Sequence, residues 1–249
     1  MYSVGLITKY WNEEILLPNF LTHLSQLNVS HIIFADDGST DSSSEIVSSY
    51  THPTSEIHHV TLEQPKSNYF EETVSESQKI NNLLNQAYNL GCHWVIHLDI
   101  DEVPSVPMIQ YINHLLPLLV PHYGIYFSIC DLYTDINTFI LFDKQNKIYR
   151  HPMPHLKIFG CESGYKRTVD QMKLDQGVEG GQMYIMTNLP YLHLKYLFKY
   201  RRYNRYNPIM GDPQLIDPHN YIIKTLPSQY IPPTLTTWYQ KFHEPSIIW

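Results

Sequence analysis

Along the first 130 residues, short apolar runs alternate with longer amphipathic segments. The apolar runs predict strands at 3–8, 31–35, 57–62, 94–98 and 123–130. The amphipathic segments predict helices near 13–27, 41–50, 73–90 and 107–116. Strands that alternate with helices are typical of βα units, so the sequence predicts a mainly parallel central sheet in an α/β fold.

Two of these helices have a clear apolar stripe. In the first, Asn12 is a natural N-cap, and Pro18 is expected to bend the helix or to delay its start. Along the segment 73–90, one face carries Ile80, Leu83, Leu84, Ala87 and Leu90. We expect both stripes to face the core.

The pattern changes beyond residue 130. Positions 143–190 show no clear period and predict either a subdomain of short strands or long loops, which in a compact domain are often functional lids. The tail from Pro208 is rich in proline, so we expect an extended segment that is packed on the surface or partly ordered. The sequence thus predicts one domain at 1–207, with halves at 1–105 and 106–207, and an extension at 208–249.

An acidic tetrad, Asp99-Ile100-Asp101-Glu102, directly follows the apolar run 94–98. Like charges that lie close together raise one another's pKa, and burial penalises the ionised forms, so such a cluster is costly without a cation. On a strand, Asp99 and Asp101 point the same way and can address one ion, and oxygen ligands favour Mg²⁺ or Mn²⁺. A solvated strand end that caps the next helix is the simpler interpretation of this motif taken alone.

A second acidic cluster, Asp36-Asp37-Gly38-Ser39-Thr40-Asp41, follows the run 31–35. Gly38 permits a tight turn, and the polar residues after it can cap the next helix. In an open α/β sheet, ligands bind at the carboxyl ends of the strands, so two acidic turns can line one crevice. The two clusters together favour a ligand site over two unrelated turns.

These residues resemble the family 2-like glycosyltransferases, which have a GT-A fold. The resemblance rests on Val4-Gly5-Leu6-Ile7-Thr8, the helix start Asn12-Glu13-Glu14, the DDGSTD turn and the HLDIDE segment from His97 to Glu102. It covers about the first 105 residues, and Tyr191-Leu192-His193-Leu194-Lys195-Tyr196 is similar to a His-bearing segment that often closes the metal site in this group. The resemblance implies a single GT-A-like domain with a less regular, acceptor-side C-terminal region.

The implied reaction is transfer of a hexosyl or pentosyl group from a nucleotide-diphosphate donor, with a UDP-sugar favoured, to a glycan, lipid-linked or protein-linked acceptor. The departing diphosphate gains negative charge, which Mn²⁺ or Mg²⁺ would stabilise. The resemblance implies Asp101 as the direct metal ligand, Asp99 on the ion or on the donor ribose, and His193 as a further ligand. A hydrogen-bonded structural role is the other interpretation of His193.

The residues that the resemblance places on the donor nucleotide are Thr8, Tyr10, Asn12, Asp36, Asp37, Lys79 and Asp99. Asp37 is favoured over Asp36 as the acceptor for the N–H of a pyrimidine base. Tyr10 or Trp11 could stack on the base or pack into the core. Lys79 could reach a phosphate or remain a solvated helix residue.

An inverting transfer needs a carboxylate that accepts the acceptor's proton, and the resemblance leans towards inversion. Asp131, Asp135 and Glu162 follow the metal motif in the sequence. We select Glu162, because its glycine neighbours let backbone and substrate approach closely, and keep Asp131 as a second candidate. A retaining transfer would need no such base.

Charge and composition limit the partners. A net charge of −7 argues against nucleic-acid binding over the whole surface. The basic aromatic segment Lys195–Arg205 could hold the diphosphate, contact an anionic membrane, bind single-stranded nucleic acid or form an ordinary surface helix. The three cysteines lack zinc or disulfide spacing, and no signal peptide or membrane-length apolar run is visible. We therefore expect core thiols and a cytoplasmic location, with peripheral membrane contact left open.

Two other functions remain open. A sugar-nucleotidyltransferase could share the fold and the ion, although the glycine-rich, Lys- or Arg-bearing phosphate loop that we would expect near the first strand is missing. A non-catalytic module could bind nucleic acid or a membrane surface through Lys195–Arg205. The carboxylates at 36, 37, 99 and 101 favour the glycosyltransferase.

Overall fold

The structure is a computed structural model that describes residues 1–62, 69–133, 135–144, 147–150, 153–163, 182–197 and 221–242. The chain divides into two compact units, which are described separately. The first unit comprises Met1–Ile100, Ile109–Tyr126 and His155–Ile185. The second comprises Asp101–Met108, Phe127–Pro154 and Met186–Trp249.

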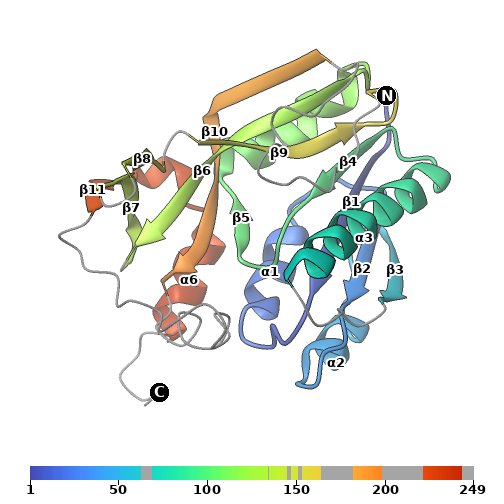
Figure 1. Cartoon of the computed structure of the whole chain (residues 1–249), viewed down its shortest axis with the longest axis horizontal. Helices are drawn as coiled ribbons and strands as arrows, with labels where there is room; N and C mark the ends of the chain where they lie inside the picture. The colour runs from blue at the N-terminus through green and yellow to red at the C-terminus, as the bar shows by residue number, and fades with distance from the viewer. Residues whose placement is uncertain are drawn as a thin grey trace. The chain divides into compact units, whose positions relative to one another are not determined.

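Four parallel strands form the sheet of the first unit (Figure 1). Their order is β4 (Trp94–His97), β1 (Val4–Tyr10), β2 (His31–Asp36) and β3 (Glu56–Thr61). In β1, Leu6 pairs with Ile32 of β2 and with Ile96 of β4. The strand β9 (Met153–Gly160) runs antiparallel to β4, with Ile158 opposite Ile96. The predicted mixed α/β fold with a mainly parallel central sheet is confirmed.

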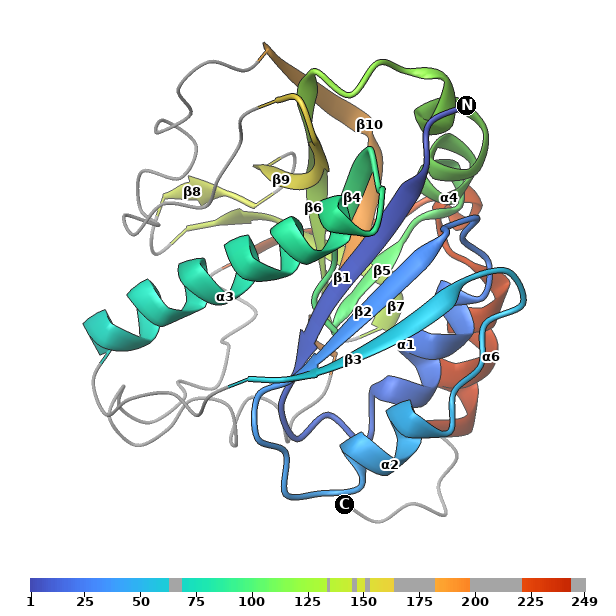
Figure 2. The ribbon, with the colours of Figure 1, turned by 90° about the vertical axis from the view of Figure 1, so that its right-hand side faces the viewer.

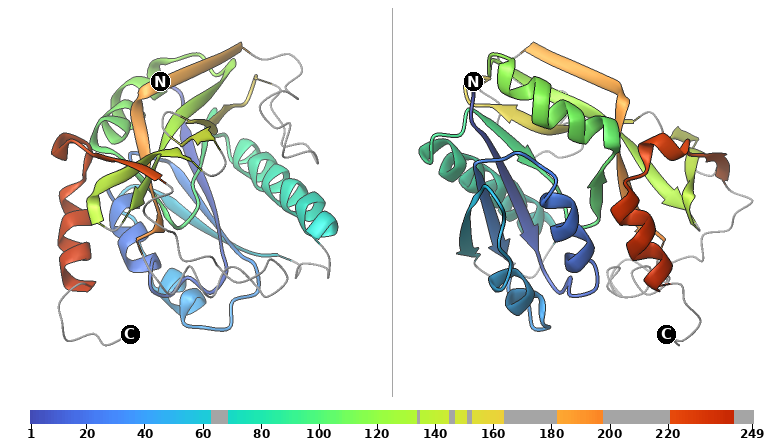
Figure 3. Two further views of the ribbon diagram at one scale, coloured as in Figure 1. Left: turned by 60° about the vertical axis from the view of Figure 1, so that its left-hand side comes forward. Right: turned by 180° about the vertical axis from the view of Figure 1, so that it is seen from behind.

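Helices cover both faces of this sheet. The long helix α3 (Tyr69–Asn89) lies across one face in Figure 2, and α1 (Leu17–Leu24) lies on the other, as the view from behind in Figure 3 shows. The short helix α2 (Ser43–Ser48) packs beside α1. The loops that enter α1 and α2 therefore both leave the sheet at the carboxyl ends of its strands.

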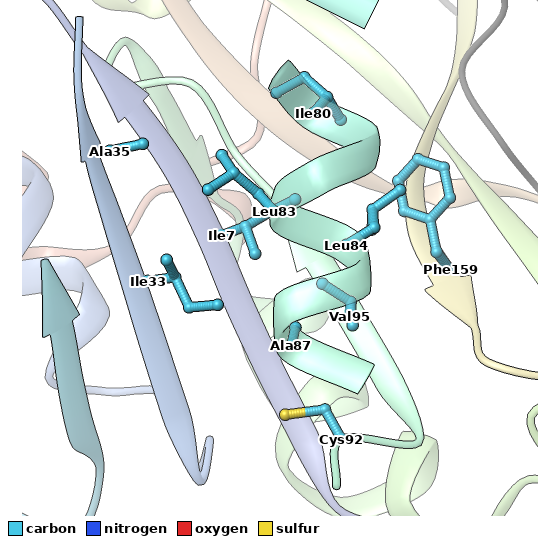
Figure 4. Packing of buried hydrophobic residues seen from close by; sticks show 10 residues of the cluster. All are labelled: Ile7, Ile33, Ala35, Ile80, Leu83, Leu84, Ala87, Cys92, Val95 and Phe159. Atoms are coloured by element: carbon cyan, nitrogen blue, oxygen red, sulfur yellow. The ribbon is translucent and has the colours of Figure 1, made fainter. Parts of the chain in front are cut away.

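The core between α3 and the sheet is the cluster drawn in Figure 4. Ile7, Ile33 and Val95 rise from three strands and meet the apolar stripe of α3. Four of the five stripe residues predicted from the sequence are buried there, namely Ile80, Leu83, Leu84 and Ala87. Each fully buried leucine or isoleucine contributes about 1.5–3 kcal/mol, so this layer holds α3 on the sheet.

Antiparallel strands dominate the second unit. The strand β7 (Asp135–Asp143) pairs with β6 (Tyr123–Tyr133), β8 (Ile148–Tyr149) and β11 (Tyr221–Thr225). The short β5 (Glu102–Pro104) pairs with β10 (Gln182–Tyr196). Of the two interpretations of the irregular region beyond residue 130, the described residues support short strands.

The remaining helical elements are short. The helix α4 (Val106–Gln110) continues as a π-helical turn, Tyr111–Leu115, and a 3₁₀ turn, Leu116–Leu118. A further 3₁₀ turn, Ser228–Tyr230, precedes the helix α6 (Pro233–Phe242). The helix α6 corrects the expectation of a tail without helix, because Pro233 occupies the first helical position, where a missing N–H costs nothing.

The start of α1 also differs from the expectation. The helix begins at Leu17, with Leu16 as an N-cap that makes no side-chain hydrogen bond, and Asn12 lies outside it. Pro18 stands in the first turn, so it delays the start of the helix rather than bending it.

Cys92 and Cys130 are buried free thiols, as expected, whereas Cys161 is a free thiol that is only partly buried. Within the described part of the chain, no helix has both the length and the apolar character that a bilayer crossing requires. The division at residues 105 and 207 stays a prediction.

His23 is buried in α1, where its Nε2–H donates to Asn19 Oδ1 (3.1 Å). Burial lowers the pKa of His23 from its ordinary 6.5 to about 4. Between these two values the unfolded chain binds a proton that the folded chain does not, so folding stability falls as the pH falls.

We therefore predict that the contribution of His23 to the free energy of unfolding is complete above pH 6.5 and that about 3 kcal/mol of it is lost as the pH drops to 4. Urea unfolding at several pH values measures this loss. In His23→Gln the loss should be reduced by that amount, and an unchanged pH profile in the variant would contradict the assignment.

Candidate functional site

The turn after β2 is built by Asp36. Its Oδ1 accepts a hydrogen bond from the Ser39 amide (2.8 Å), its Oδ2 accepts one from the Ser44 hydroxyl, and Gly38 takes a positive φ of 84°. Burial alone would raise the pKa of Asp36, but the hydrogen bonds from Ser44, Ser39 and Gly38 outweigh it and lower the pKa. Asp36 therefore holds the turn as a carboxylate.

Asn12 ties the β1–α1 loop to this turn. Its side-chain Oδ1 accepts a hydrogen bond from the Thr40 backbone amide (2.8 Å), and its backbone N–H donates to Ser39 Oγ (3.2 Å). Asn12 has a φ of 51°, in the left-handed region that asparagine tolerates better than most residues. The residue thus acts as a loop clasp, whereas its contact with a nucleotide stays a prediction.

Asp37 is buried between two lysines. Its Oδ2 lies 3.2 Å from Lys9 Nζ, and its Oδ1 pairs with Lys79 Nζ. Lys79 is itself buried, so the alternative of a solvated helix residue is wrong. The pair joins β2 to α3 at the carboxyl end of the sheet and compensates the charge of Asp37 without an ion.

Tyr10 and Thr8 belong to the core. Tyr10 is buried, and its pKa is raised by burial and by the nearby charge of Asp36. Thr8 is fully buried, and its hydroxyl has no hydrogen-bond partner among the described residues. Of the two interpretations of Tyr10, the structure favours packing into the core over stacking on a base.

Asp99 follows β4 at the same edge of the sheet as Asp36 and Asp37, because β1 lies between β2 and β4 in parallel register. Its side chain is 44% exposed. The carboxylate is flanked by the buried side chains of His97 and Lys157, with Nε2 at 3.7 Å from Oδ1 and Nζ at 3.9 Å from Oδ2. Asp36, Asp37 and Asp99 thus lie at one edge of the sheet of the first unit.

In the second unit, Asp101 and His193 come together through the pairing of β5 and β10. Glu102 is opposite His193, and the Leu194 amide donates to the Asp101 carbonyl (2.8 Å). His193 Nε2 lies 3.1 Å from Asp101 Oδ2, and His193 Nδ1 lies 2.6 Å from Asp131 Oδ1. Two residues predicted as metal ligands, 92 positions apart, are therefore in contact.

The pKa of His193 reflects these contacts. Burial alone would lower it, but the charges and hydrogen bonds of Asp101 and Asp131 outweigh burial and raise the pKa to about 10. A carboxylate that holds one ring nitrogen through its N–H orients the other nitrogen, as it does in many metal-binding histidines. This donor set, an imidazole nitrogen beside a carboxylate oxygen, fits a divalent ion such as Mn²⁺.

Glu162 lies elsewhere. The strand β9 is antiparallel to β4, and Gly160 at its end pairs with Trp94 at the start of β4. Glu162, two residues after Gly160, therefore lies near the amino end of β4, whereas Asp99 lies beyond the carboxyl end. Glu162 is about half exposed and pairs with His122, whose Nδ1 is 2.6 Å from Oε2. The structure does not bring this candidate base to the acidic edge.

Two predictions remain, the candidate base Asp135 and the basic aromatic segment Lys195–Arg205. Asp135 accepts the Asn137 amide through its Oδ1 (2.7 Å) and stabilises its own turn. In the basic aromatic segment Lys195–Arg205, residues 198–205 lie outside the described residues, as do the side chains of Lys195 and Tyr196.

Two lysines that contact the acidic residues, Lys9 and Lys157, were not predicted from the sequence. Lys9 could have been found from strand alternation, because it shares a face of β1 with Ile7, towards α3. Lys157 gives no local signal, since only the antiparallel pairing of β9 with β4 brings it to Asp99.

Comparison with known proteins gives a family match and structural similarities. Residues 6–112 match the model of glycosyl transferase family 2. The fold is similar to the crystal structure of S. aureus TarS 1-349, with a TM-score of 0.51 and 14% identity over 78% of this chain and 60% of that one. No curated protein matched the chain. The predicted family resemblance is confirmed over residues 6–112, and the TarS similarity bears on the fold alone.

Two further structures are less similar. S. aureus TarS gives a TM-score of 0.47 and 15% identity over 77% of this chain and 36% of that one. The structure of glucosyl-3-phosphoglycerate synthase from Mycobacterium tuberculosis, in complex with Mn²⁺, UDP and glucosyl-3-phosphoglycerate, gives a TM-score of 0.34 and 15% identity over 52% of this chain and 44% of that one. This chain spans 60% of the first TarS structure and less of the other two.

The clasp at Asn12 leads to a stability prediction. Asn12→Gly keeps the positive φ and loses the side-chain acceptor, so unfolding should become easier by roughly 0.5–1.5 kcal/mol. Asn12→Ala should lose a further ~1 kcal/mol, because alanine is strained at this φ. Urea unfolding of both variants checks the order, and an alanine variant as stable as the glycine variant would argue against the strained clasp.

Proposed function

From the family 2 glycosyltransferase match over residues 6–112, we propose that this chain transfers a sugar from a nucleotide-diphosphate donor to an acceptor hydroxyl with the help of a divalent ion. A UDP-sugar donor and an inverting transfer are parts of the proposal. A glycan, lipid-linked or protein-linked hydroxyl is the acceptor class.

The observation that carries the proposal is the contact of His193 with both Asp101 and Asp131. Asp101 and His193 would hold the ion, and Asp131 would fix the ring of His193. Asp99, two residues before Asp101, would address the same donor. The bound ion would stabilise the negative charge that develops on the departing diphosphate.

The donor base would meet the turn at Asp37. Each carboxylate oxygen has two lone pairs, so Asp37 can accept the N–H of a pyrimidine while it stays paired with Lys9 and Lys79. Asp36 is occupied by the turn itself, which supports the choice of Asp37. Lys157, buried beside the exposed carboxylate of Asp99, adds a positive charge at the same edge of the sheet.

Neither Glu162 nor Asp131 is kept as the catalytic base. Glu162 is at the opposite end of β4 from Asp99, and Asp131 is buried and bonded to His193. We therefore assign Asp131 a positioning role, and an inverting transfer would draw its base from another carboxylate.

The donor site is tested by thermal unfolding with a panel of nucleoside diphosphates, each with and without Mn²⁺. A ligand at 100 times its Kd stabilises the folded state by about 2.7 kcal/mol, so UDP with Mn²⁺ should raise Tm by several degrees. Asp37→Asn should reduce the UDP effect and Asp101→Asn the Mn²⁺ dependence. No shift with any pair would contradict the proposal.

A second test separates the two roles of Asp131. If Asp131 orients His193, Asp131→Asn should weaken Mn²⁺ binding by about 10- to 100-fold, as measured by calorimetry. If Asp131 is instead the base, kcat should fall while Mn²⁺ affinity is unchanged. Asp135→Asn is the matched control, because this carboxylate bonds only locally to the Asn137 amide among the contacts above and should leave Mn²⁺ affinity unaltered.

A further inference from the structure

A cluster of two histidines and a glutamate lies at the amino ends of β2 and β3, away from the acidic edge. His31 opens β2, and Glu56 opens β3 directly opposite it. His58 is two residues further along β3 and pairs with Ile33. From His31 to Asp36 the strand covers about 16 Å, so the cluster is remote from the acidic turn.

All three side chains share one face of the sheet. Residues two apart on a strand point to the same face, so the side chain of His31 points to the face of Ile33. For the same reason Glu56 and His58 share a face, and His58 is paired with Ile33. Ile33 faces α3, which places the cluster at the end of that face. Figure 2 shows β2 and β3 side by side along their whole length.

The ligand atoms of the three residues converge. His31 Nδ1 is 3.2 Å from His58 Nε2, His31 Nδ1 is 3.7 Å from Glu56 Oε2, and His58 Nε2 is 3.9 Å from Glu56 Oε1. One ligand atom from each residue lies within 4.8 Å of the other two. Two imidazole nitrogens on one tetrahedral zinc ion are about 3.3 Å apart, given Zn–N bonds of about 2.0–2.1 Å. The nitrogen pair therefore already has the spacing of bound ligands.

We propose that His31, Glu56 and His58 form a binding site for a transition-metal ion, with Zn²⁺ as the best fit. The two histidines are partly buried and held by paired strands, while Glu56 is 69% exposed and free to turn its carboxylate inward. The exposed side leaves a fourth position for water, which completes a tetrahedron.

The chemistry of this site differs from that of the acidic edge. Two imidazoles favour Zn²⁺, Co²⁺ or Ni²⁺ over Mg²⁺, which prefers oxygen ligands. Bound there, the ion would cross-link β3 to β2 and stabilise the pairing of the two strands. The site is independent of the proposed sugar transfer.

A direct hydrogen bond between the two imidazoles is the competing explanation of the short nitrogen–nitrogen distance. In that case the pair needs no metal, and Glu56 is an ordinary surface carboxylate. The two explanations predict different behaviour towards Co²⁺, whose visible absorption reports coordination by nitrogen ligands in a tetrahedral site.

The experiment is a titration of the untagged, metal-stripped full chain with Co²⁺, followed by visible absorption, and with Zn²⁺, followed by calorimetry. We expect one tetrahedral Co²⁺ site that Zn²⁺ displaces and that excess Mg²⁺ does not. The double variant His31→Gln/His58→Gln should lose at least tenfold in Zn²⁺ affinity. Glu56→Gln should lose less, because the imidazoles remain.

Two controls make the result specific. His59→Gln alters the neighbouring residue of β3, which stacks on Phe34 on the other face, and should bind Zn²⁺ as the parent chain does. Asp101→Ala removes a ligand of the proposed donor site and should also leave the Co²⁺ spectrum intact. Thermal unfolding of each metal-free variant verifies that it is folded.

The proposal is overturned if the double variant is folded and keeps the Co²⁺ spectrum, or if no tetrahedral spectrum appears at millimolar Co²⁺. A spectrum that disappears in Asp101→Ala would assign the ion to the other site and would equally overturn it. None of these outcomes bears on UDP binding, so the two proposals fail separately.

Discussion

The parallel pairing of β1 with both β2 and β4 is the constraint on which the site depends. Since the three strands run the same way, the segments that follow them leave the sheet at one edge. Asp36, Asp37 and Asp99 reach this edge for that reason. The core between α3 and the strands holds the arrangement, because Ile7, Ile33 and Val95 each pack against the helix.

The structure also compensates the negative charge of its clustered carboxylates. A cluster of carboxylates suggests a metal, yet the structure supplies cations of its own. Lys9 and Lys79 pair with Asp37, Lys157 flanks Asp99, and His193 bridges Asp101 and Asp131. A lysine with its ordinary pKa of about 10.4 keeps its proton and does not ligate a metal at neutral pH, whereas a histidine can lose its proton and become a ligand. His193 is therefore the place where a divalent ion best fits the second unit.

The two histidine sites illustrate how the same side chain serves different chemistry. His193 lies between two buried carboxylates, which orient its ring and favour its charged form in the absence of an ion. His31 and His58 face one another at the partly exposed ends of paired strands, with a single exposed carboxylate beside them. The first arrangement suits an ion that also binds oxygen ligands, and the second suits zinc.

The sequence by itself determined the four parallel strands of the first unit, the apolar stripe of α3, the two acidic turns and the family resemblance, because strand alternation, helical spacing and turn chemistry are local. It also singled out His193, but only through the resemblance. Tertiary structure alone decided that Asp131 meets His193, that Lys157 meets Asp99 and that Glu162 lies at the far end of β4. The same holds for His31 and His58, which strand pairing joins across 27 residues. These contacts depend on strand order and direction, and no spacing along the chain encodes them.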